Sequence, residues 1–248
     1  MVYTKSYTSN LGLGLALALG LFGSCMYVSS TFMKLKNADK TIEVKGFSEQ
    51  KIVSDIVVWS GNLVARGTSI SEAFGKLETD KKQVLGFLSA EDIKADQINM
   101  APVVKDTIFR MDEKGNPTNN PESYILRQKF TVTSGDVHKI SALSVKIDQL
   151  NTQGVEFESS RPDFFFSSEK LNQVKVDLLG DATKSARERA QQLALNSGSG
   201  VGQLVSARQG IFQVTAENST DLSDYGVYDT STIDKVVKIV VTLSYTIN

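Results

Sequence analysis

The sequence predicts an α+β protein, built on a mainly antiparallel sheet backed by helices and preceded by one N-terminal transmembrane helix. Stretches in which apolar and polar residues alternate, the pattern of strands, are interleaved with stretches in which apolar residues recur every three or four positions, the pattern of helices. Several strand patterns follow one another across short turns, which indicates hairpins and antiparallel pairing. With 248 residues, 41% of them hydrophobic, the chain can bury a substantial core.

The N-terminal segment predicts the transmembrane helix. No charged residue occurs from Ser6 to Met33, and about 20 apolar residues suffice to span a bilayer as a helix. Three interpretations remain open: a retained signal anchor, which we favour, a cleaved signal peptide with Lys5 as its positive residue, and a lipoprotein signal that ends at Cys25. The expected division of the chain is a tail at 1–9, an anchor at 10–33, a linker at 34–40 and one folded domain at 41–248.

The charges beside this segment do not fix its orientation. Lys5 precedes it, whereas Lys34, Lys36 and Lys40 follow it. The positive-inside rule, taken alone, would place the C-terminal part in the cytoplasm. The opposite orientation is expected only from the family that the rest of the chain resembles.

Two strands and a helix are expected at the start of the folded domain. In residues 42–46 apolar and charged residues alternate, which predicts a short strand. The second strand, residues 52–65, is apolar on both faces, which predicts that helices or a neighbouring subunit cover both of them. Ser69 and Glu72 form a capping-box pattern, so a helix is expected to begin there and to end near Ser89.

A hairpin is expected after this helix. A strand at 97–111 and another that begins at Tyr124 flank a segment rich in Gly, Asn and Pro at 112–121, the composition of a turn. The two strands are therefore predicted to be antiparallel neighbours. A second helix follows, capped by Ser134 or Asp136.

The last part of the chain continues the alternation. A strand at 155–166 is interrupted at Arg161-Pro162, and because proline cannot donate to a ladder this indicates a sheet edge or a bulge. The longest helix is expected at 168–196, where alanines recur every four residues and allow close packing. The remaining expected elements are a strand at 201–214, a polar loop at 216–234 and a final strand at 237–247.

The residue types that carry most catalysis are sparse. No Gly-x-Ser-x-Gly motif accompanies the single histidine, His138, so we expect a surface or capping role for it. The single cysteine, Cys25, lies in an apolar segment that disfavours a thiolate. Four acidic residues of the polar loop do not follow the spacing of a calcium loop and are expected to be solvated: Glu217, Asp221, Asp224 and Asp229. We therefore expect no catalytic, cofactor or metal site.

The stretch from Ile42 to Glu49, followed by Val53 and Asp55, resembles the start of the SIMPL domain, which opens with a short strand, a glycine, a glutamate and an aspartate at the head of a long strand. Later segments are also similar to that family. They are Tyr124 to Thr133 with Asp136 and Val137, Ala182 to Ala190 with Gly198, Arg208-Gln209-Gly210, and Ile233 to Tyr245. The resemblance covers about Thr41 to Asn248.

The resemblance implies a bacterial cell-envelope protein that has no established catalytic residues, in a family some of whose members are thought to form ring-like or hollow oligomers. We therefore expect a single-pass protein of the cytoplasmic (inner) membrane with its domain in the periplasm. It would not be an enzyme, and it would act in cell-envelope maintenance or stress response. The net charge of −1 offers no basic surface for nucleic acid.

Self-assembly into a homo-oligomer, of which a ring is one form, is the expected activity of the domain. The expected interface residues lie on two strands and are Ile52, Ile56, Val58, Trp59, Phe164, Phe165 and Phe166. The alternative is a binding module for a small molecule or an envelope polymer in a crevice between helix and sheet. An enzyme is the third and least favoured hypothesis.

Overall fold

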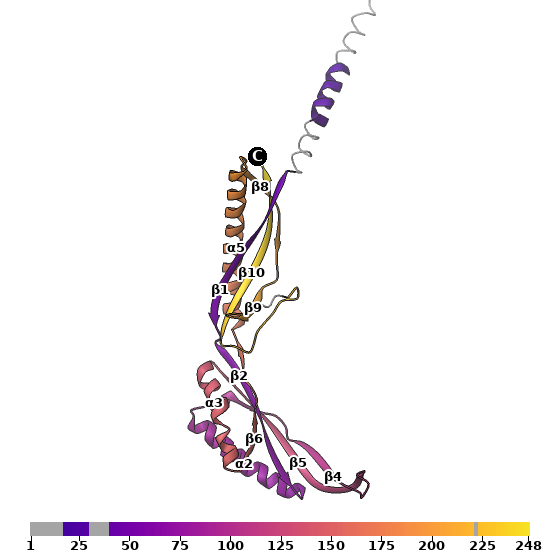
Figure 1. Ribbon diagram of the computed structural model, residues 1–248, viewed down its shortest axis with the longest axis vertical. Coiled ribbons are helices and arrows are strands. Elements are labelled where there is room, and N and C mark those ends of the chain that lie inside the picture. The colour runs from indigo at the N-terminus through magenta and orange to yellow at the C-terminus, as the bar shows by residue number, and fades with distance from the viewer. Residues whose placement is uncertain (1–16, 30–39, 221–222) are drawn as a thin grey trace, which may run out of the picture. The chain divides into compact units, whose positions relative to one another are not determined.

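The computed structural model describes residues 17–29, 40–220 and 223–248 (Figure 1). The fold is α+β, with antiparallel sheets backed by helices, as the sequence predicts. The folded part divides into two compact units. The first contains the chain up to Ser48 with Leu178–Ile211 and Ile239–Asn248, and the second contains Glu49–Asp177 and Phe212–Lys238.

A four-stranded sheet is ordered β1-β10-β8, and β9 also pairs with β10. In the first unit, helix α5 lies alongside β1 and β10 (Figure 1). It presents the alanine stripe that the sequence predicts, and all four side chains are buried: Ala182, Ala186, Ala190 and Ala194. The bounds of these elements are β1 Thr41–Val53, α5 Ser168–Asn196, β8 Val201–Gln209, β9 Gln213–Ala216 and β10 Asp234–Ile247.

Gly46 is the place where β1 and α5 come closest. A Cβ atom at this position would lie 1.9 Å from the carbonyl oxygen of Ala182 and 2.7 Å from the Cβ of Ala186. The Arg189 guanidinium donates a hydrogen bond of 2.9 Å to the carbonyl oxygen of Lys45. The sequence predicts that the first strand ends at Gly46, and this prediction is wrong. Gly46 gives the helix backbone room, and β1 continues to Val53.

The second unit contains a six-stranded sheet ordered β3-β5-β2-β6, with β4 also on β5 and β7 also on β2. Its strands are β2 Ile56–Gly67, β3 Ile98–Met100, β4 Val104–Met111, β5 Pro117–Ser134, β6 Glu156–Ser159 and β7 Asp163–Phe165. Its helices are α2 Ile70–Ala90, α3 Val137–Lys146 and α4 Gln149–Thr152, with a 3₁₀ turn η1 at Ala95–Gln97. The expected hairpin is present as β4 and β5, and the interruption before Pro162 separates β6 from β7.

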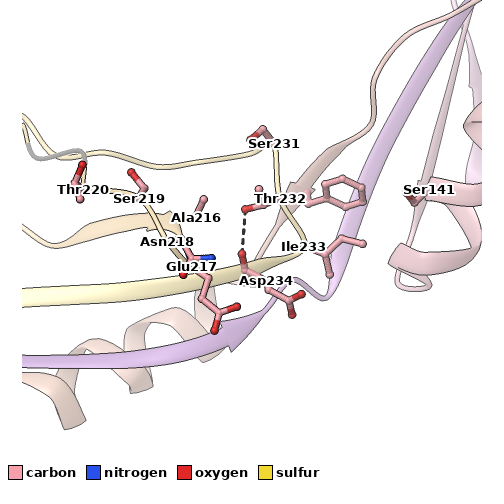
Figure 2. A pocket seen from close by; sticks show the side chains of 11 residues that line it. Ser141, Ala216, Glu217, Asn218, Ser219, Thr220, Ser231, Thr232, Ile233 and Asp234 are labelled. Carbon is pink, nitrogen blue, oxygen red and sulfur yellow. Dashed lines mark hydrogen bonds between the residues drawn. The ribbon is translucent and has the colours of Figure 1, made fainter.

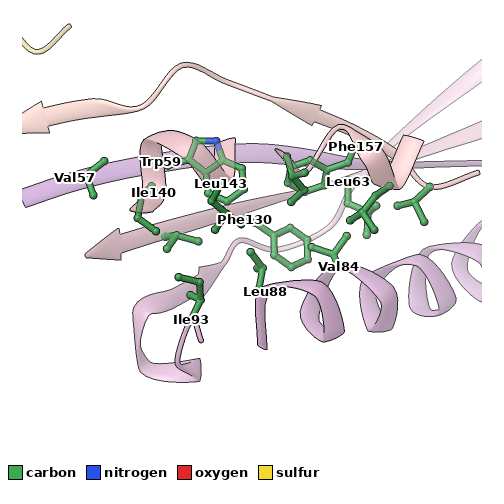
Figure 3. Packing of buried hydrophobic residues seen from close by; sticks show 14 of the residues in the cluster. Val57, Trp59, Leu63, Val84, Leu88, Ile93, Phe130, Ile140, Leu143 and Phe157 are labelled. Carbon is green, nitrogen blue, oxygen red and sulfur yellow. The ribbon is translucent and has the colours of Figure 1, made fainter. Parts of the chain in front are cut away.

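The core of the second unit lies between this sheet and the helices α2 and α3 (Figure 3). Three aromatic rings meet at its centre. The ring centroids of Trp59 and Phe157 are 6.1 Å apart, and Phe130 contacts Phe157 edge to face at 6.2 Å. Gly61 makes this packing possible, because a Cβ there would lie 2.4 Å from the Phe157 ring.

Helix α2 begins where the sequence predicts. The Ser69 hydroxyl accepts a hydrogen bond of 3.2 Å from the backbone N–H of Glu72. The Glu72 carboxylate reaches one residue further back than in a standard capping box and accepts from the backbone N–H and the hydroxyl of Thr68, both at 2.7 Å. The bond from Glu72 to Ser69 satisfies one of the donors that the first helical turn leaves without an intrahelical partner.

The N-terminal helix that the structure describes covers residues 17–29. No helix within the described part of the chain is long and apolar enough to cross a membrane. This finding contradicts the predicted transmembrane helix and the single-pass placement in the cytoplasmic membrane. The rest of the expected anchor, the tail at 1–9 and nearly all of the linker lie outside the described residues.

Candidate functional site

The seven expected interface residues divide into two groups. Ile52, Trp59 and Phe164 are almost fully buried, with exposed fractions of 6%, 1% and 5%. Trp59 and Phe164 belong to the core cluster of the second unit. These three side chains hold the fold together and leave almost no surface for another molecule.

The other four interface candidates are half-buried and lie near one another. Ile56 is opposite Phe165 in the ladder between β2 and β7. The Phe165 ring stacks on Tyr228, with centroids 6.4 Å apart. The backbone N–H of Phe166 donates to the Tyr228 hydroxyl at 3.1 Å. Val58 is half-buried on the same face of β2 as Ile56, so the structure brings these residues near one another with part of their surface covered.

Several exposed apolar side chains of the second unit lie together on strand β4 instead. Val104 and Met111 are 59% and 69% exposed, and Ile108 and Phe109 are also exposed. The sequence predicts this strand and its hairpin but not the exposure. Four apolar residues in an eight-residue strand are equally compatible with a strand whose faces are buried, so the sequence does not reveal the exposure.

Strand β4 is also an edge of its sheet. Its only pairing partner among the described strands is β5. One row of its backbone N–H and C=O groups therefore faces away from the sheet. Such an edge is a template for pairing with another strand. Lys105, Asp106 and Arg110 are the charged residues of this strand, and Asp106 forms an ion pair with Arg127 of β5.

The two strands of the hairpin differ in how their edges are protected. In β5, Pro117 and Pro121 lie opposite Met111 and Phe109. A proline has no N–H and cannot donate to a ladder, so proline on an edge blocks pairing. Strand β4 has no proline. The asymmetry leaves β4 as the open side of the hairpin.

An open cavity of about 810 Å³ lies elsewhere in the second unit (Figure 2). One wall is the segment 216–220 after β9, and the other is the segment 231–234 that leads into β10. Phe164 of β7 and Ser141 of α3 complete the lining. Most of the lining side chains are polar.

Asp229 holds the second wall in place. Its carboxylate accepts hydrogen bonds from the backbone N–H of Ser231 at 3.1 Å and of Thr232 at 3.2 Å. The hydroxyl groups of Ser231 and Thr232 donate to the same carboxylate. The Lys235 ammonium donates to it at 3.2 Å. The sequence predicts a solvated carboxylate here. The signal that could have found this role is local, because the donors Ser231, Thr232 and Lys235 all follow Asp229 within six positions.

The charges of this group are mutually adjusted. Burial raises the pKa of Asp229, but the hydrogen bonds from Ser231, Thr232 and Lys235 outweigh burial and hold this pKa far below its ordinary value. Burial lowers the pKa of Lys235, and Asp229 offsets part of that effect. The Lys235 side chain has no exposed surface, and its ammonium also donates to the carbonyl oxygen of Thr232. Both groups therefore serve to fix the loop.

The first wall has a charge pair of its own. Glu217 forms an ion pair with Lys51 of β1, and the Lys238 ammonium donates to the carbonyl oxygen of Ser219 at 3.3 Å. Within the part of the chain that the structure describes, Asn218 and the Asp234 carboxylate make no hydrogen bond. Both side chains are exposed in the cavity, and the charge of Asp234 also acts on Lys51.

Asp55, which belongs to the stretch that carries the family resemblance, anchors the start of α5. Its carboxylate accepts from the backbone N–H of Ser167 at 2.7 Å and from the Ser167 hydroxyl at 2.9 Å. The Lys170 ammonium lies 2.7 Å from the same carboxylate. Burial raises the pKa of Asp55, but the hydrogen bonds from Lys170 and Ser167 lower it by more, so the net shift of this pKa is downward. A negative charge is favourable at this end of a helix.

The remaining candidates stay apart from one another. His138 is exposed on α3, and Asp224 is exposed in the polar loop. Cys25 is exposed on the helix of residues 17–29. Within the three described ranges, no group of three or more His, Cys, Asp or Glu side chains is placed to hold a metal ion. Asp221 lies outside those ranges.

Comparison with known protein families gives a match over most of the chain. The family model described as SIMPL, a protein of unknown function (DUF541), matches residues 42–242. No curated protein matches the chain.

Three similar solved structures illustrate how distant such likenesses are. The de novo designed protein Foldit4 is 16% identical, over 42% of this chain and 93% of that one, with a TM-score of 0.22. An uncharacterized conserved protein from Listeria innocua is 8% identical, over 78% and 92%, with a TM-score of 0.20. A hydantoinase/carbamoylase family amidase from Burkholderia ambifaria is 10% identical, over 47% of this chain and 29% of the amidase, with a TM-score of 0.26. These scores are too low to carry an argument.

Proposed function

The chain belongs to the SIMPL family, whose function is unknown, and from this premise we propose that it is a non-catalytic protein that self-associates through the free edge of strand β4. The observation that carries the proposal is the combination of an unpaired backbone edge with four exposed apolar side chains on the same strand. Proteins normally protect such edges, because an exposed apolar edge pairs with other strands.

The sequence of β4 is suited to pairing with a second copy of itself. In an antiparallel pair centred on Ile108, Ile108 faces Ile108 of the second copy. Asp106 then faces Arg110 of the second copy, and the reverse contact occurs across the two-fold axis. Opposite charges in directly opposed positions stabilise a strand pair. Moving the register by one residue in one direction would place Lys105 against Arg110, which opposes like charges.

This arrangement determines the kind of assembly. A pairing related by a two-fold axis uses the same surface on both copies and closes after two chains. The β4 edge alone therefore gives a dimer that joins two six-stranded sheets. A ring-like oligomer would need a second, different surface. The group of the half-buried Ile56 and Phe165 with the exposed Tyr228 is the candidate for that contact.

The non-catalytic part of the proposal rests on what the perturbed groups do. Strongly shifted pKa values mark candidate catalytic residues when the group can reach a substrate. The Asp229 carboxylate is instead filled by donors from its own loop, and Lys235 is completely enclosed. Their shifts follow from holding the loop in place.

A charge-exchange experiment tests the self-association and its register together. Arg110→Asp would oppose Asp106 with aspartate across the dimer, and Asp106→Arg would oppose Arg110 with arginine. Each variant alone should self-associate at least tenfold more weakly than the unchanged chain. An equimolar mixture of the two should restore association, because every opposed pair is then of opposite charge. Sedimentation equilibrium over a wide range of concentrations measures the association constants.

The matched control is Lys114→Asp at the tip of the hairpin, outside the paired register, which should leave association unchanged. A chain that stays monomeric at the highest concentration would refute the proposal. Association that Arg110→Asp does not weaken would refute the β4 interface. Two weak variants that fail to pair with each other would refute the register.

A further inference from the structure

We propose that the cavity between residues 216–220 and 231–234 binds a neutral saccharide through its hydroxyl groups. This inference is independent of self-association, because the cavity shares no residue with β4. Its volume of about 810 Å³ falls within the range of small-molecule sites.

The lining has the chemistry of a site for hydroxyl donors. Five of its eleven residues carry a hydroxyl group, two carry a carboxylate and one carries an amide. Neither lysine nor arginine is among them, and the nearby Lys51 is already paired with Glu217. Carboxylates accept hydrogen bonds and repel negative charge. The cavity is therefore suited to a ligand that donates many hydrogen bonds and carries no phosphate or carboxylate.

The second wall presents acceptors in a fixed arrangement. Ser231 and Thr232 use their hydroxyl hydrogens in bonds to Asp229, and Thr232 also shares its hydrogen with the main-chain oxygen of Asp234 at 3.0 Å (Figure 2). Because each hydroxyl has only one hydrogen but two lone pairs, what remains available is acceptor capacity. The hydroxyl groups of a sugar supply the matching donors.

The backbone of this wall is held from outside the loop as well. The Arg161 guanidinium donates to the carbonyl oxygen of Ser231 at 2.7 Å. The backbone N–H of Ser54 donates to the carbonyl oxygen of Ile233 at 2.9 Å. A wall that is ordered before the ligand arrives loses little conformational freedom on binding. The acceptors of Ser231 and Thr232 are therefore already in place for the ligand.

The cavity also offers two features that fit a sugar in particular. The side chains of Asn218 and Asp234 are exposed in it and make no hydrogen bond within the described residues, so each can form one with a ligand without breaking another. Phe164 and Ile233 supply the apolar part of the lining. A pyranose ring presents hydroxyl groups around its rim and C–H groups on its face, which matches a polar cavity with a small apolar surface.

Binding can be measured on the full chain with defined probes. Chitotriose and maltotriose are the neutral saccharides, glucose 6-phosphate is the anionic control and spermidine is the cationic control. Saturation-transfer NMR detects weak binding, and a titration gives the dissociation constant. We expect at least one neutral trisaccharide to bind, and we expect Asn218→Ala and Asp234→Asn each to weaken its binding at least tenfold.

The control variant is Asp224→Asn, an exposed loop carboxylate outside the cavity lining, which should bind as the unchanged chain does. The fluorescence of buried Trp59 verifies that each variant is folded. If neither trisaccharide binds at about 10 mM, tenfold above a millimolar dissociation constant, the proposal is overturned. Preferred binding of glucose 6-phosphate or of spermidine would also overturn it, as would saccharide binding that both cavity variants leave unchanged.

Discussion

The ammonium of Lys235 lies 3.2 Å from the carboxylate of Asp229, and the lysine side chain is completely enclosed while the aspartate keeps 17% of its surface exposed. The two residues are not equivalent in this pair. Asp229 has four further donors from Ser231 and Thr232. Lys235 has, besides Asp229, the carbonyl oxygen of Thr232. The enclosed lysine therefore depends more on the aspartate than the aspartate depends on the lysine.

Replacing Asp229 should consequently be one of the most damaging changes in the loop. Asp229→Ala leaves a buried ammonium without its counter-ion and removes the acceptor of four other bonds, so we expect a loss of about 3–5 kcal/mol in the free energy of unfolding. Lys235→Met should cost less, because Asp229 keeps its other donors. Urea denaturation followed by Trp59 fluorescence measures both.

Asp224→Ala is the matched control for these variants. It removes an exposed carboxylate from the same loop and should change the free energy of unfolding by no more than about 0.5 kcal/mol. If Lys235→Met lowered the free energy of unfolding as much as Asp229→Ala does, the inference that Lys235 depends more on Asp229 than Asp229 depends on Lys235 would be wrong.

Asp55 should contribute to the loss of stability in acid. Its pKa in the folded chain lies below its ordinary value, so the unfolded chain binds the proton more readily. The contribution is complete above the unfolded pKa of about 4 and is lost as the pH falls through the folded pKa. Asp55→Asn should therefore lose less stability than the unchanged chain between pH 6 and pH 3.

The control for this prediction is Asp181→Asn on the exposed side of α5, whose carboxylate makes no hydrogen bond among the described residues. Denaturant titrations at several pH values give the free energies. At pH 7, Asp55→Asn should already be less stable by about 1–3 kcal/mol, the usual contribution of hydrogen bonds to a charged group. An identical acid dependence in Asp55→Asn and the unchanged chain would contradict the prediction.

Two glycine-to-alanine changes should have opposite signs. Gly46→Ala places a methyl group against the backbone of α5, so α5 or β1 must shift, at a cost of about 1–3 kcal/mol or more. Gly86→Ala meets nothing within 4 Å on the surface of α2, and alanine is the better helix former by up to about 1 kcal/mol. Thermal denaturation followed by circular dichroism should show a lower midpoint for the first and an unchanged or higher midpoint for the second.

Trp59 and Ile108 should separate stability from association. Trp59 is enclosed and donates a hydrogen bond of 3.1 Å to Ser159, so Trp59→Ala should lower the free energy of unfolding by about 3–5 kcal/mol. Ile108→Ala on exposed β4 should change stability little and should weaken self-association. Circular dichroism and sedimentation equilibrium give the two readouts. A stable Trp59→Ala variant that fails to associate would restore Trp59 as an interface residue.

Much of the fold follows from local sequence. The capping pattern at Ser69 places the start of α2, the alanines of α5 predict its close packing, and Pro162 marks the break between β6 and β7. Each signal depends on residues a few positions apart, which is why the sequence alone contains it. The predicted end of the first strand at Gly46 is wrong because this glycine is needed for close packing against α5, more than 130 positions away.

The candidate sites follow the same division. Trp59 and Phe164 are apolar and aromatic, which suits an interface as well as a core, and only the packing of α2 and α3 decides between the two. The exposure of β4 depends on which strand lies at the edge of the sheet. The order of strands depends on contacts between distant segments, so no short segment predicts it. The role of Asp229 was close to visible, because its partners lie within six positions. The burial of Lys235, which makes its ion pair with Asp229 important for stability, could not be seen in the sequence.

The prolines of the hairpin have a consequence for the size of any assembly. If two copies join through β4, each consumes the open side of its hairpin, and the side that remains carries Pro117 and Pro121. A third chain then finds no donor-complete strand to extend at that tip. Strand addition at this tip would stop at the pair, so the prolines of β5 would limit the growth that the open edge of β4 begins.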